Sequence, residues 1–203
     1  MKETLIISFL VIIIYIFLFV NKNNLVLMES SSTGTKILVN NDEKKKESAD
    51  LLGSLIQIMF KLKNHLIKNK EKLVSQYEGK FKESDLRECI DMLDKNFDEA
   101  KTKIYENPPS SDYTSYSVNK GEELAFCLRS KKNGNHHTLN LLMYVAIHEM
   151  AHIGCREIGH TDLFKEIFAF YTKEAIKIGV YRYEDYDSNP VEYCGMILSS
   201  SII

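Results

Sequence analysis

The chain has 203 residues, a formal net charge of −2 and a pI of about 6.3. A composition of 44% hydrophobic and 27% charged residues is typical of a globular protein and excludes a disordered or fibrous chain. Nucleic acid is not expected as a partner, because its binding usually requires a basic field. The lysines of residues 61–82 are grouped, a pattern typical of the solvated face of a helix.

An apolar segment begins the chain. Residues 5–20 read LIISFLVIIIYIFLFV, with Ser8 as the one polar residue. As a helix this segment covers about 24 Å, slightly less than the ~30 Å hydrocarbon core of a bilayer, and a short span can thin the bilayer locally. A cleavable signal peptide is the alternative, but NKNN follows where a small-x-small cleavage site would lie. We therefore expect residues 1–20 to form an uncleaved, single-pass transmembrane anchor that places the protein at a membrane.

Residues 21–48 are mostly polar, with STG and DEKKKE stretches and only brief apolar patches. Such a composition indicates a flexible linker or stalk. The folded domain is then expected to cover residues 49–203.

Four helices are predicted in this domain. Apolar residues recur every three or four positions over residues 49–77 and 84–104, and Asn107-Pro108-Pro109 ends the second of these helices. Two further helices are expected over residues 139–153 and 161–179, the last of them ending at a glycine.

A β-hairpin, or an edge pair of a small sheet, is predicted before the third helix. Residues 114–118 (TSYSV) alternate with period two, and residues 124–128 (LAFCL) form a short apolar run of strand-forming residues. Asn119-Lys120-Gly121 is the turn signal between them. Helices and a short sheet together predict an α+β domain.

The sequence IHEMAHIGCREIGH, residues 147–160, holds three of the six histidines. His148 and His152 are four residues apart, which puts both imidazoles on one face of a helix within reach of a single cation. Glu149 lies beside them without needing to bind the ion. This is the H-E-x-x-H arrangement, in which two histidines bind zinc and the glutamate acts as a general base toward water.

A catalytic zinc usually has three protein ligands. Six residues after His152, where a metzincin has its third histidine, stands Ile158, so that pattern fails. His160 lies eight residues after His152 and follows Gly159, which can end the helix and turn the chain back toward the ion. His160 is therefore the expected third ligand, and Glu166 and Glu174 on the next helix are the alternatives.

Four cysteines, Cys89, Cys127, Cys155 and Cys194, are spread along the chain without a CxxC pair, so a cysteine zinc site is not expected. Their even number permits two disulfides, but the chain is not a short, cysteine-dense scaffold. Free thiols are expected.

The stretch HEMAH, with GH at residues 159–160 and Phe164, resembles the HExxH…GH…F signature of the WLM and SprT-like zincins. The nearest likeness is to WLM-like metallopeptidases of large DNA viruses and algae. It is carried by SYSVNKGEELAFCLR, LNLLMYVAIHEMAHIG, GHTDLFKEIF and NPVEYCGM, and it spans most of residues 49–203. The resemblance implies a small α+β zincin domain, with its HExxH helix at the centre, and zinc on His148, His152 and His160. A role in DNA–protein crosslink repair is not carried over, because the pI is near neutral and an anchor suits that role poorly.

These observations predict a membrane-anchored zinc metallopeptidase that hydrolyses peptide bonds of a protein or peptide substrate, with Glu149 as the general base. A second donor must stabilise the oxyanion. The candidates are the tail tyrosines Tyr181, Tyr183, Tyr186 and Tyr193. Tyr193 lies in the most family-like stretch and is therefore the expected catalytic residue. The alternatives are a zinc-binding pseudoenzyme and a membrane-associated interaction protein without proteolytic activity.

Overall fold

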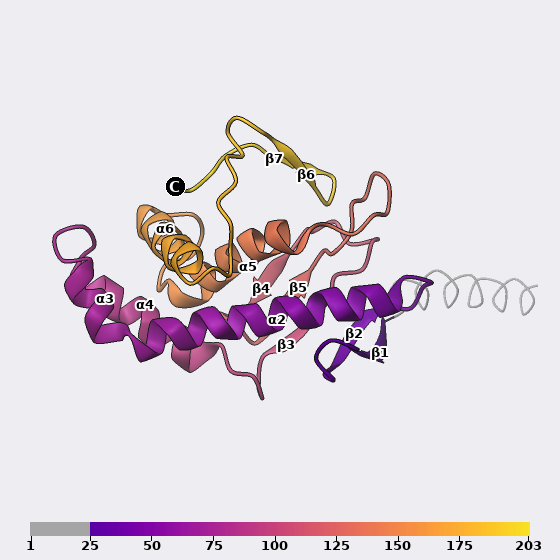
Figure 1. The fold of residues 1–203 in the computed structure, drawn as a ribbon, viewed down its shortest axis with the longest axis horizontal. Helices are drawn as coiled ribbons and strands as arrows, with labels where there is room; N and C mark the ends of the chain where they lie inside the picture. Colours follow the sequence, from indigo (N-terminus) through magenta and orange to yellow (C-terminus); the bar gives the residue numbers. More distant parts are fainter. Residues whose placement is uncertain (1–24) are drawn as a thin grey trace, which may run out of the picture.

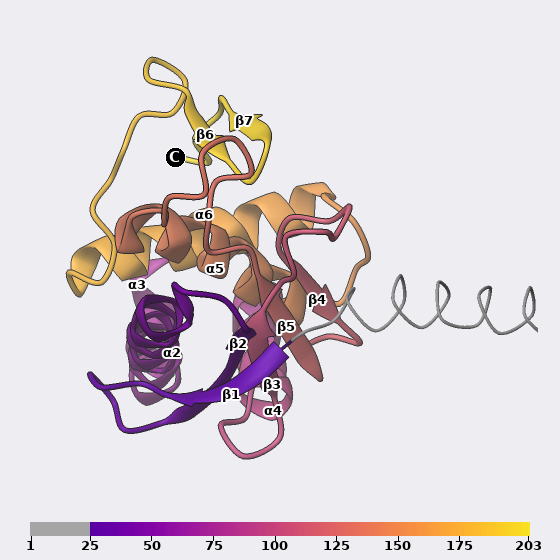
Figure 2. The ribbon, with the colours of Figure 1, turned by 90° about the vertical axis from the view of Figure 1, so that its right-hand side faces the viewer.

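The structure, a computed structural model, describes residues 25–203. Helices pack against a five-stranded sheet, and a C-terminal hairpin lies above the helices in the view of Figure 1 (Figures 1 and 2). This arrangement confirms the predicted α+β class.

The sheet has the strand order β1-β2-β3-β5-β4. Its strands are β1 (Leu25–Glu29), β2 (Lys36–Asn40), β3 (Lys103–Glu106), β4 (Tyr116–Val118) and β5 (Glu123–Phe126). The two outer pairs are antiparallel, whereas β3 runs parallel to both β2 and β5. The predicted hairpin is confirmed as β4–β5, with Ser117 opposite Leu124.

The helices are α2 (Lys45–Lys68), α3 (Lys70–Gln76), α4 (Glu83–Asn96), α5 (Leu139–Gly154) and α6 (Asp162–Lys177). The long helix α2 crosses the molecule beneath α5 and α6 in the view of Figure 1. Its apolar stripe, with Leu52, Met59 and Leu62 among its members, is fully buried, as the spacing of these residues predicts.

Helix α5 lies at the centre and contacts α2, α4 and α6. Nearly all of its side chains are buried, so it carries no amphipathic pattern. It begins at Thr138, whose hydroxyl accepts a hydrogen bond from the amide of Leu141 at 3.2 Å. At its other end Gly154 leaves room for the Tyr171 hydroxyl, which donates to the Cys89 carbonyl at 2.8 Å. Contacts with three helices therefore fix the helix that holds the HExxH motif.

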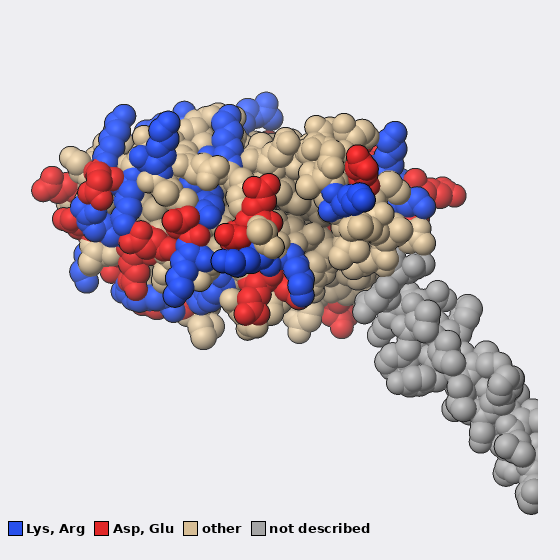
Figure 3. Space-filling model, turned by 90° about the horizontal axis from the view of Figure 1, so that it is seen from below, with Lys and Arg blue, Asp and Glu red and all other residues tan. Residues whose placement is uncertain are grey.

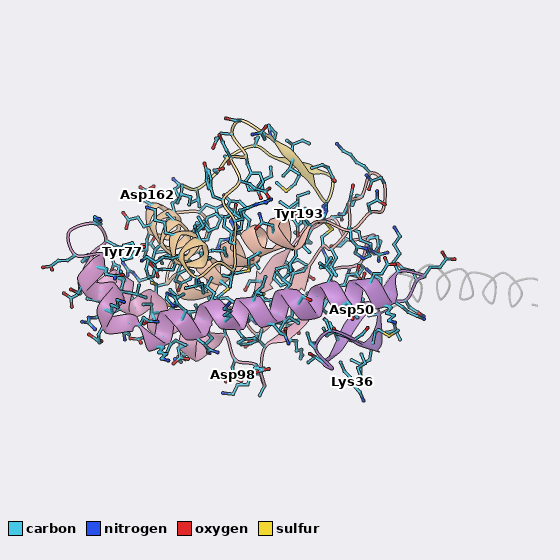
Figure 4. All side chains as sticks on the ribbon, in the orientation of Figure 1. Lys36, Asp50, Tyr77, Asp98, Asp162 and Tyr193 are labelled. Carbon is cyan, nitrogen blue, oxygen red and sulfur yellow. A yellow bond between two sulfur atoms is a disulfide. The ribbon has the colours of Figure 1, made fainter. Side chains whose placement is uncertain are left out.

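Residues 25–48, which the sequence predicts to be a linker, are folded in the structure. Strands β1 and β2 form an antiparallel pair there, and Ile37 and Val39 of β2 are buried in the core. The turn between the strands is fastened to α2, because the Asp50 carboxylate accepts a hydrogen bond from the Ser31 hydroxyl at 3.0 Å (Figure 4). The linker prediction is wrong for this range because its short apolar runs form strands, and β2 buries Ile37 and Val39 while Leu38 between them faces outward.

The predicted helix over residues 84–104 is too long. Helix α4 ends at Asn96, and the Asp98 carboxylate accepts a hydrogen bond from the Ala100 amide at 2.9 Å in a local turn. Ile104 then lies in β3, where it pairs with Leu124 of β5. Hydrogen bonding to two neighbouring strands outweighs the helical spacing of these apolar residues.

The expectation of free thiols holds for Cys89 and Cys155, which are buried and unpaired, but is wrong for the other two cysteines. Cys127 and Cys194 form a disulfide across 67 residues of sequence. It joins the end of β5 to the C-terminal hairpin of β6 (Val191–Tyr193) and β7 (Met196–Leu198). Widely separated cysteines give no spacing signal, so only the fold brings this pair together.

The predicted transmembrane anchor, residues 1–20, lies outside the described part of the chain. Within residues 25–203, no helix has the length and apolar character needed to cross a bilayer.

Candidate metal centre

Two of the predicted ligands stand one helical turn apart on α5. Their Nε2 atoms, on His148 and His152, are 3.1 Å from each other. Both rings belong to the half-buried side of a helix that is otherwise enclosed. The four-residue spacing thus produces the predicted convergence of the two imidazoles.

The chain leaves α5 at Cys155, whose backbone is extended, and turns at Gly159, where φ is +84°. Such a φ favours glycine because it has no Cβ. The turn brings His160 back over the helix, with its Nε2 3.2 Å from that of His152 and 3.1 Å from that of His148. Helix α6 starts directly afterwards, capped by the Thr161 hydroxyl. The structure therefore brings together the three histidines that the sequence predicts.

The three nitrogens fit a tetrahedrally bound zinc ion. Ligand atoms about 2.0–2.1 Å from such an ion lie about 3.3 Å from one another, close to the 3.1–3.2 Å observed. Hydrogen bonds among the three Nε2 atoms cannot satisfy all of them, because each Nε2 holds at most one proton and faces two other nitrogens. A cation accepts all three lone pairs at once. Among the described residues, these three side chains form the group suited to hold a metal ion.

Aromatic side chains from α6 enclose the histidines. The Phe164 ring stacks on His152 with 4.2 Å between ring centroids, and Phe168 meets His148 edge-on at 5.2 Å. Burial lowers the pKa of His148 to about 3 and that of His152 to about 4, with the neighbouring imidazoles as a further cause. Both rings are therefore neutral near pH 7, with lone pairs free for a metal.

Glu149 is 5% exposed and faces the same cleft as the histidines. Burial raises the pKa of its carboxyl group to about 8. A carboxyl group with a pKa near neutrality can both accept and release a proton, as a general base that later acts as an acid must do.

The cleft in front of the histidines has a volume of about 750 Å³. One wall is β4 with the residues before it, 114–117, and β4 is the terminal strand of the sheet on this side. The opposite wall comes from the C-terminal hairpin through Tyr193, Met196 and Leu198. Apart from Tyr193, the sequence predicts no residue of either wall as part of a site, because nothing in their spacing relates them to the HExxH motif.

Tyr193 is the one member of the predicted tyrosine set that lines the cleft. It comes from β6 and lies between the hairpin and the sheet (Figure 4), where its hydroxyl donates to the Cys127 carbonyl at 3.1 Å and contacts the Ser115 hydroxyl. Tyr181 and Tyr186 are instead buried against Tyr144, and Tyr183 is exposed.

The two alternative ligands lie elsewhere. Glu174 is fully buried and accepts hydrogen bonds from His65 and Tyr77, and it forms an ion pair with Lys177. Glu166 lines a separate surface pocket beside α3 and α4. Neither carboxylate approaches the histidines, so His160 is left as the third candidate ligand.

The face shown in Figure 3 carries charges of both signs. On the face shown in Figure 3, Lys and Arg side chains lie among Asp and Glu. Several are paired, as Lys70 is with Asp91 and Arg87 with Glu71. Apart from Lys63, which is buried, the grouped lysines of α2 and α3 thus belong to a mixed, solvated surface.

The fold and the site together define an α+β protein with three histidines and a glutamate in one cleft. The chain belongs to the family of the uncharacterized protein R325 of Acanthamoeba polyphaga mimivirus. The two are 36% identical over 182 residues, which cover 87% of this chain and 83% of that protein. The predicted relationship to proteins of large DNA viruses is thereby confirmed.

Two further viral proteins match part of the chain. Uncharacterized protein 136R of Invertebrate iridescent virus 6 is 34% identical over 45% of this chain and 49% of its own length. Uncharacterized protein 042R of Invertebrate iridescent virus 3 is 40% identical over 34% of this chain and 43% of its own length. No family model matches the chain.

Among solved structures, the crystal structure of Wss1 from Saccharomyces cerevisiae aligns with a TM-score of 0.34 and 16% identity, over 46% of this chain and 73% of that one. A mutant of Wss1 aligns similarly, with a TM-score of 0.33 and 15% identity. The family assignment rests on the mimivirus relative.

Proposed function

We propose that the protein is a zinc-dependent metallopeptidase. The observation that supports this best is the convergence of three imidazole Nε2 atoms within 3.1–3.2 Å of one another beside a buried glutamate. His148, His152 and His160 would hold the ion. Zinc bound in this way supplies a Lewis acid that lowers the pKa of water toward 7.

Glu149 takes the proton from the attacking water and passes it to the leaving amine. Its burial suits this exchange, since burial raises the pKa of the carboxyl group and so makes the carboxylate a stronger proton acceptor. Phe164 and Phe168 exclude water behind the histidines, which strengthens electrostatic interactions in front of them.

The substrate proposed is an extended polypeptide. Strand β4 ends the sheet next to the histidines, and the residues just before and within it line the cleft. An exposed strand edge offers backbone hydrogen bonds to a peptide that adds as a further strand. Apolar side chains of the opposite wall, Met196 and Leu198, then face the side chains of the bound peptide.

Anchoring at a membrane is a separate part of the proposal. It rests on the apolar run of residues 5–20 alone. Extraction of membranes with alkaline carbonate tests it: an anchored protein stays in the pellet, whereas release into the supernatant would contradict an integral anchor.

The experiment that tests the peptidase proposal compares two variants of the full-length chain. Glu149→Gln is expected to retain zinc and lose peptide hydrolysis, by at least 100-fold in kcat, whereas His148→Ala is expected to lose zinc. Retained hydrolysis in Glu149→Gln would contradict the proposed base. The wild-type chain is also tested on a library of unfolded protein substrates. If it binds zinc but cleaves none of them, the protein is a zinc-binding pseudoenzyme.

A further inference from the structure

The turn between β4 and β5 makes three hydrogen bonds with the segment that connects two of the candidate ligands. The ammonium group of Lys120 donates to the carbonyl oxygen of His152 at 3.2 Å, of Cys155 at 2.6 Å and of Glu157 at 2.6 Å. An ammonium group has three N–H donors, so these contacts use all of them.

These carbonyl groups belong to the end of α5 and to the loop that leads to His160. The last four carbonyls of an α-helix have no partner within the helix, and a cation at this end is favourable. The Glu157 carbonyl lies beyond the helix, three residues before His160. Lys120 therefore connects the end of the helix carrying His152 to the loop carrying His160.

The backbone of the turn is itself fixed. Asn119 and Lys120 have φ values of 46° and 57°, and Gly121 has φ of +110°. A Cβ on Gly121 would lie 2.8 Å from the Asn96 carbonyl oxygen and 3.3 Å from the side chain of Ile153. The turn is thus wedged against the ends of α4 and α5, and Lys120 reaches the loop from a rigid base.

We propose that Lys120 is a positioning residue for the metal centre, which holds residues 155–157 so that the imidazole of His160 faces those of His148 and His152. The inference rests on the proposed function and adds to it a residue outside the HExxH motif. Lys120 lines the cleft, but its ammonium group bonds to the carbonyl oxygens of His152, Cys155 and Glu157, so it acts through the backbone of the loop.

Two effects of Lys120 on metal binding have opposite signs, which makes the inference testable. Its positive charge would lie near a bound cation and by Coulomb's law would weaken binding, so its removal would tighten zinc binding if charge alone mattered. If Lys120 positions the loop, its removal weakens binding, because His160 must be ordered when the metal binds.

The test is a zinc titration of the full-length chain in competition with a chromophoric chelator. Lys120→Met, which keeps the length of the side chain without its donors, is expected to raise the Kd for Zn²⁺ by about 10–100-fold. Lys120→Gln, with two N–H donors on a shorter side chain, is expected to give a smaller increase. The absorption bands of Co²⁺ in the site should change in Lys120→Met, since the third nitrogen is less well placed.

Lys63→Met is the matched control. Lys63 also caps a helix end, since its ammonium group donates to the carbonyls of Asp94 at 3.1 Å and Phe97 at 2.6 Å at the end of α4, away from the cleft. This variant is expected to lower the Tm without changing the Kd for Zn²⁺. An equal loss of zinc affinity in Lys63→Met would show that the effect of Lys120→Met comes from lower overall stability, and it would overturn the inference.

A Kd that is unchanged or lower in Lys120→Met, with wild-type binding intact, would overturn the inference alone. If Lys120→Met does not fold, the Kd of Lys120→Gln decides, and a value equal to that of the wild type overturns the inference. A wild-type chain without affinity for Zn²⁺ would instead overturn the proposed function on which the inference depends.

Discussion

At the scale of single residues, ionisation of the buried Glu149 carboxyl group should destabilise the metal-free protein. Its folded-state pKa of about 8 lies above the ordinary value of 4.5. The free energy of unfolding is therefore unaffected by this group below pH 4.5, and it falls as the pH rises from 4.5 toward 8, because the unfolded chain releases the proton more readily. Glu149→Gln removes the titration. We expect this variant to raise the Tm of the metal-free protein by roughly 5 °C at pH 7 and to leave it unchanged at pH 4.

Thermal unfolding in the presence of a chelator measures this difference. Glu166→Gln, at an exposed position on α6, is the control and should shift the Tm at neither pH. An equal Tm for wild type and Glu149→Gln at pH 7 would show that the carboxyl group is well solvated.

Tyr193 presents a second question at this scale. Its hydroxyl has one proton, which it donates to the Cys127 carbonyl, so stabilising an oxyanion would require exchange of that bond. If Tyr193 stabilises the oxyanion, as the sequence predicts, Tyr193→Phe lowers kcat by about 100-fold with zinc content and KM unchanged. Steady-state kinetics decide this, and an unchanged kcat would leave the hydroxyl with its structural bond alone.

At the scale of elements, the C-terminal hairpin depends on one covalent connection to the sheet. The disulfide of Cys127 and Cys194 closes a loop across 67 residues. A loop of this length gives a stabilisation of about 4 kcal/mol in the chain-entropy account. Cys194→Ser is expected to lower the free energy of unfolding by that order, measured by urea denaturation.

The control for the disulfide is chemical. A dithiol reductant should destabilise the wild type to the level of Cys194→Ser and should leave Cys194→Ser itself unaffected, since Cys89 and Cys155 are unpaired. A wild type whose stability is insensitive to complete reduction would contradict the structural role of the bond.

Helices and hairpin turns could be predicted from the sequence because their signals are local. Leu52, Met59 and Leu62 recur with helical spacing and are buried along one stripe of α2. Ile104 fits the same kind of spacing and yet lies in β3, because it pairs with Leu124 of β5 and β3 also pairs with the distant strand β2. Strand pairing between remote segments cannot be read from periodicity.

Some residues of the site could likewise be predicted from local sequence, and others could not. The three histidines and Glu149 fall within thirteen residues, so helix geometry and one glycine suffice to bring them together. Lys120 acts on backbone carbonyls, which no residue type reveals in advance. Tyr193 could be named from its likeness to a family, but its contact with Ser115 arises only from the folded hairpin.

At the scale of the whole molecule, residues 25–48 belong to the folded domain. They contribute two strands and the first turn of α2, and they bury Ile37 and Val39. A truncated chain of residues 25–203 is expected to unfold cooperatively. A chain of residues 49–203 should be less stable by about 3–6 kcal/mol, since each buried Ile or Val contributes about 1.5–3 kcal/mol.

Urea denaturation followed by circular dichroism compares the two chains. The shorter chain also exposes the edge of β3, and an unpaired strand edge promotes aggregation. Equal stability of the two chains would mean that β1 and β2 are dispensable and that the domain begins at residue 49.

The central claim is that three histidines from α5 and the following loop bind one metal ion. Elemental analysis of the full-length chain, purified without added chelator, tests it most directly. The account predicts about one zinc ion per chain, its loss in His160→Ala and its retention in the control His136→Ala, whose ring contacts Ser48 instead. A chain without zinc that also fails to bind added Zn²⁺, or full retention of zinc by His160→Ala, would contradict the account.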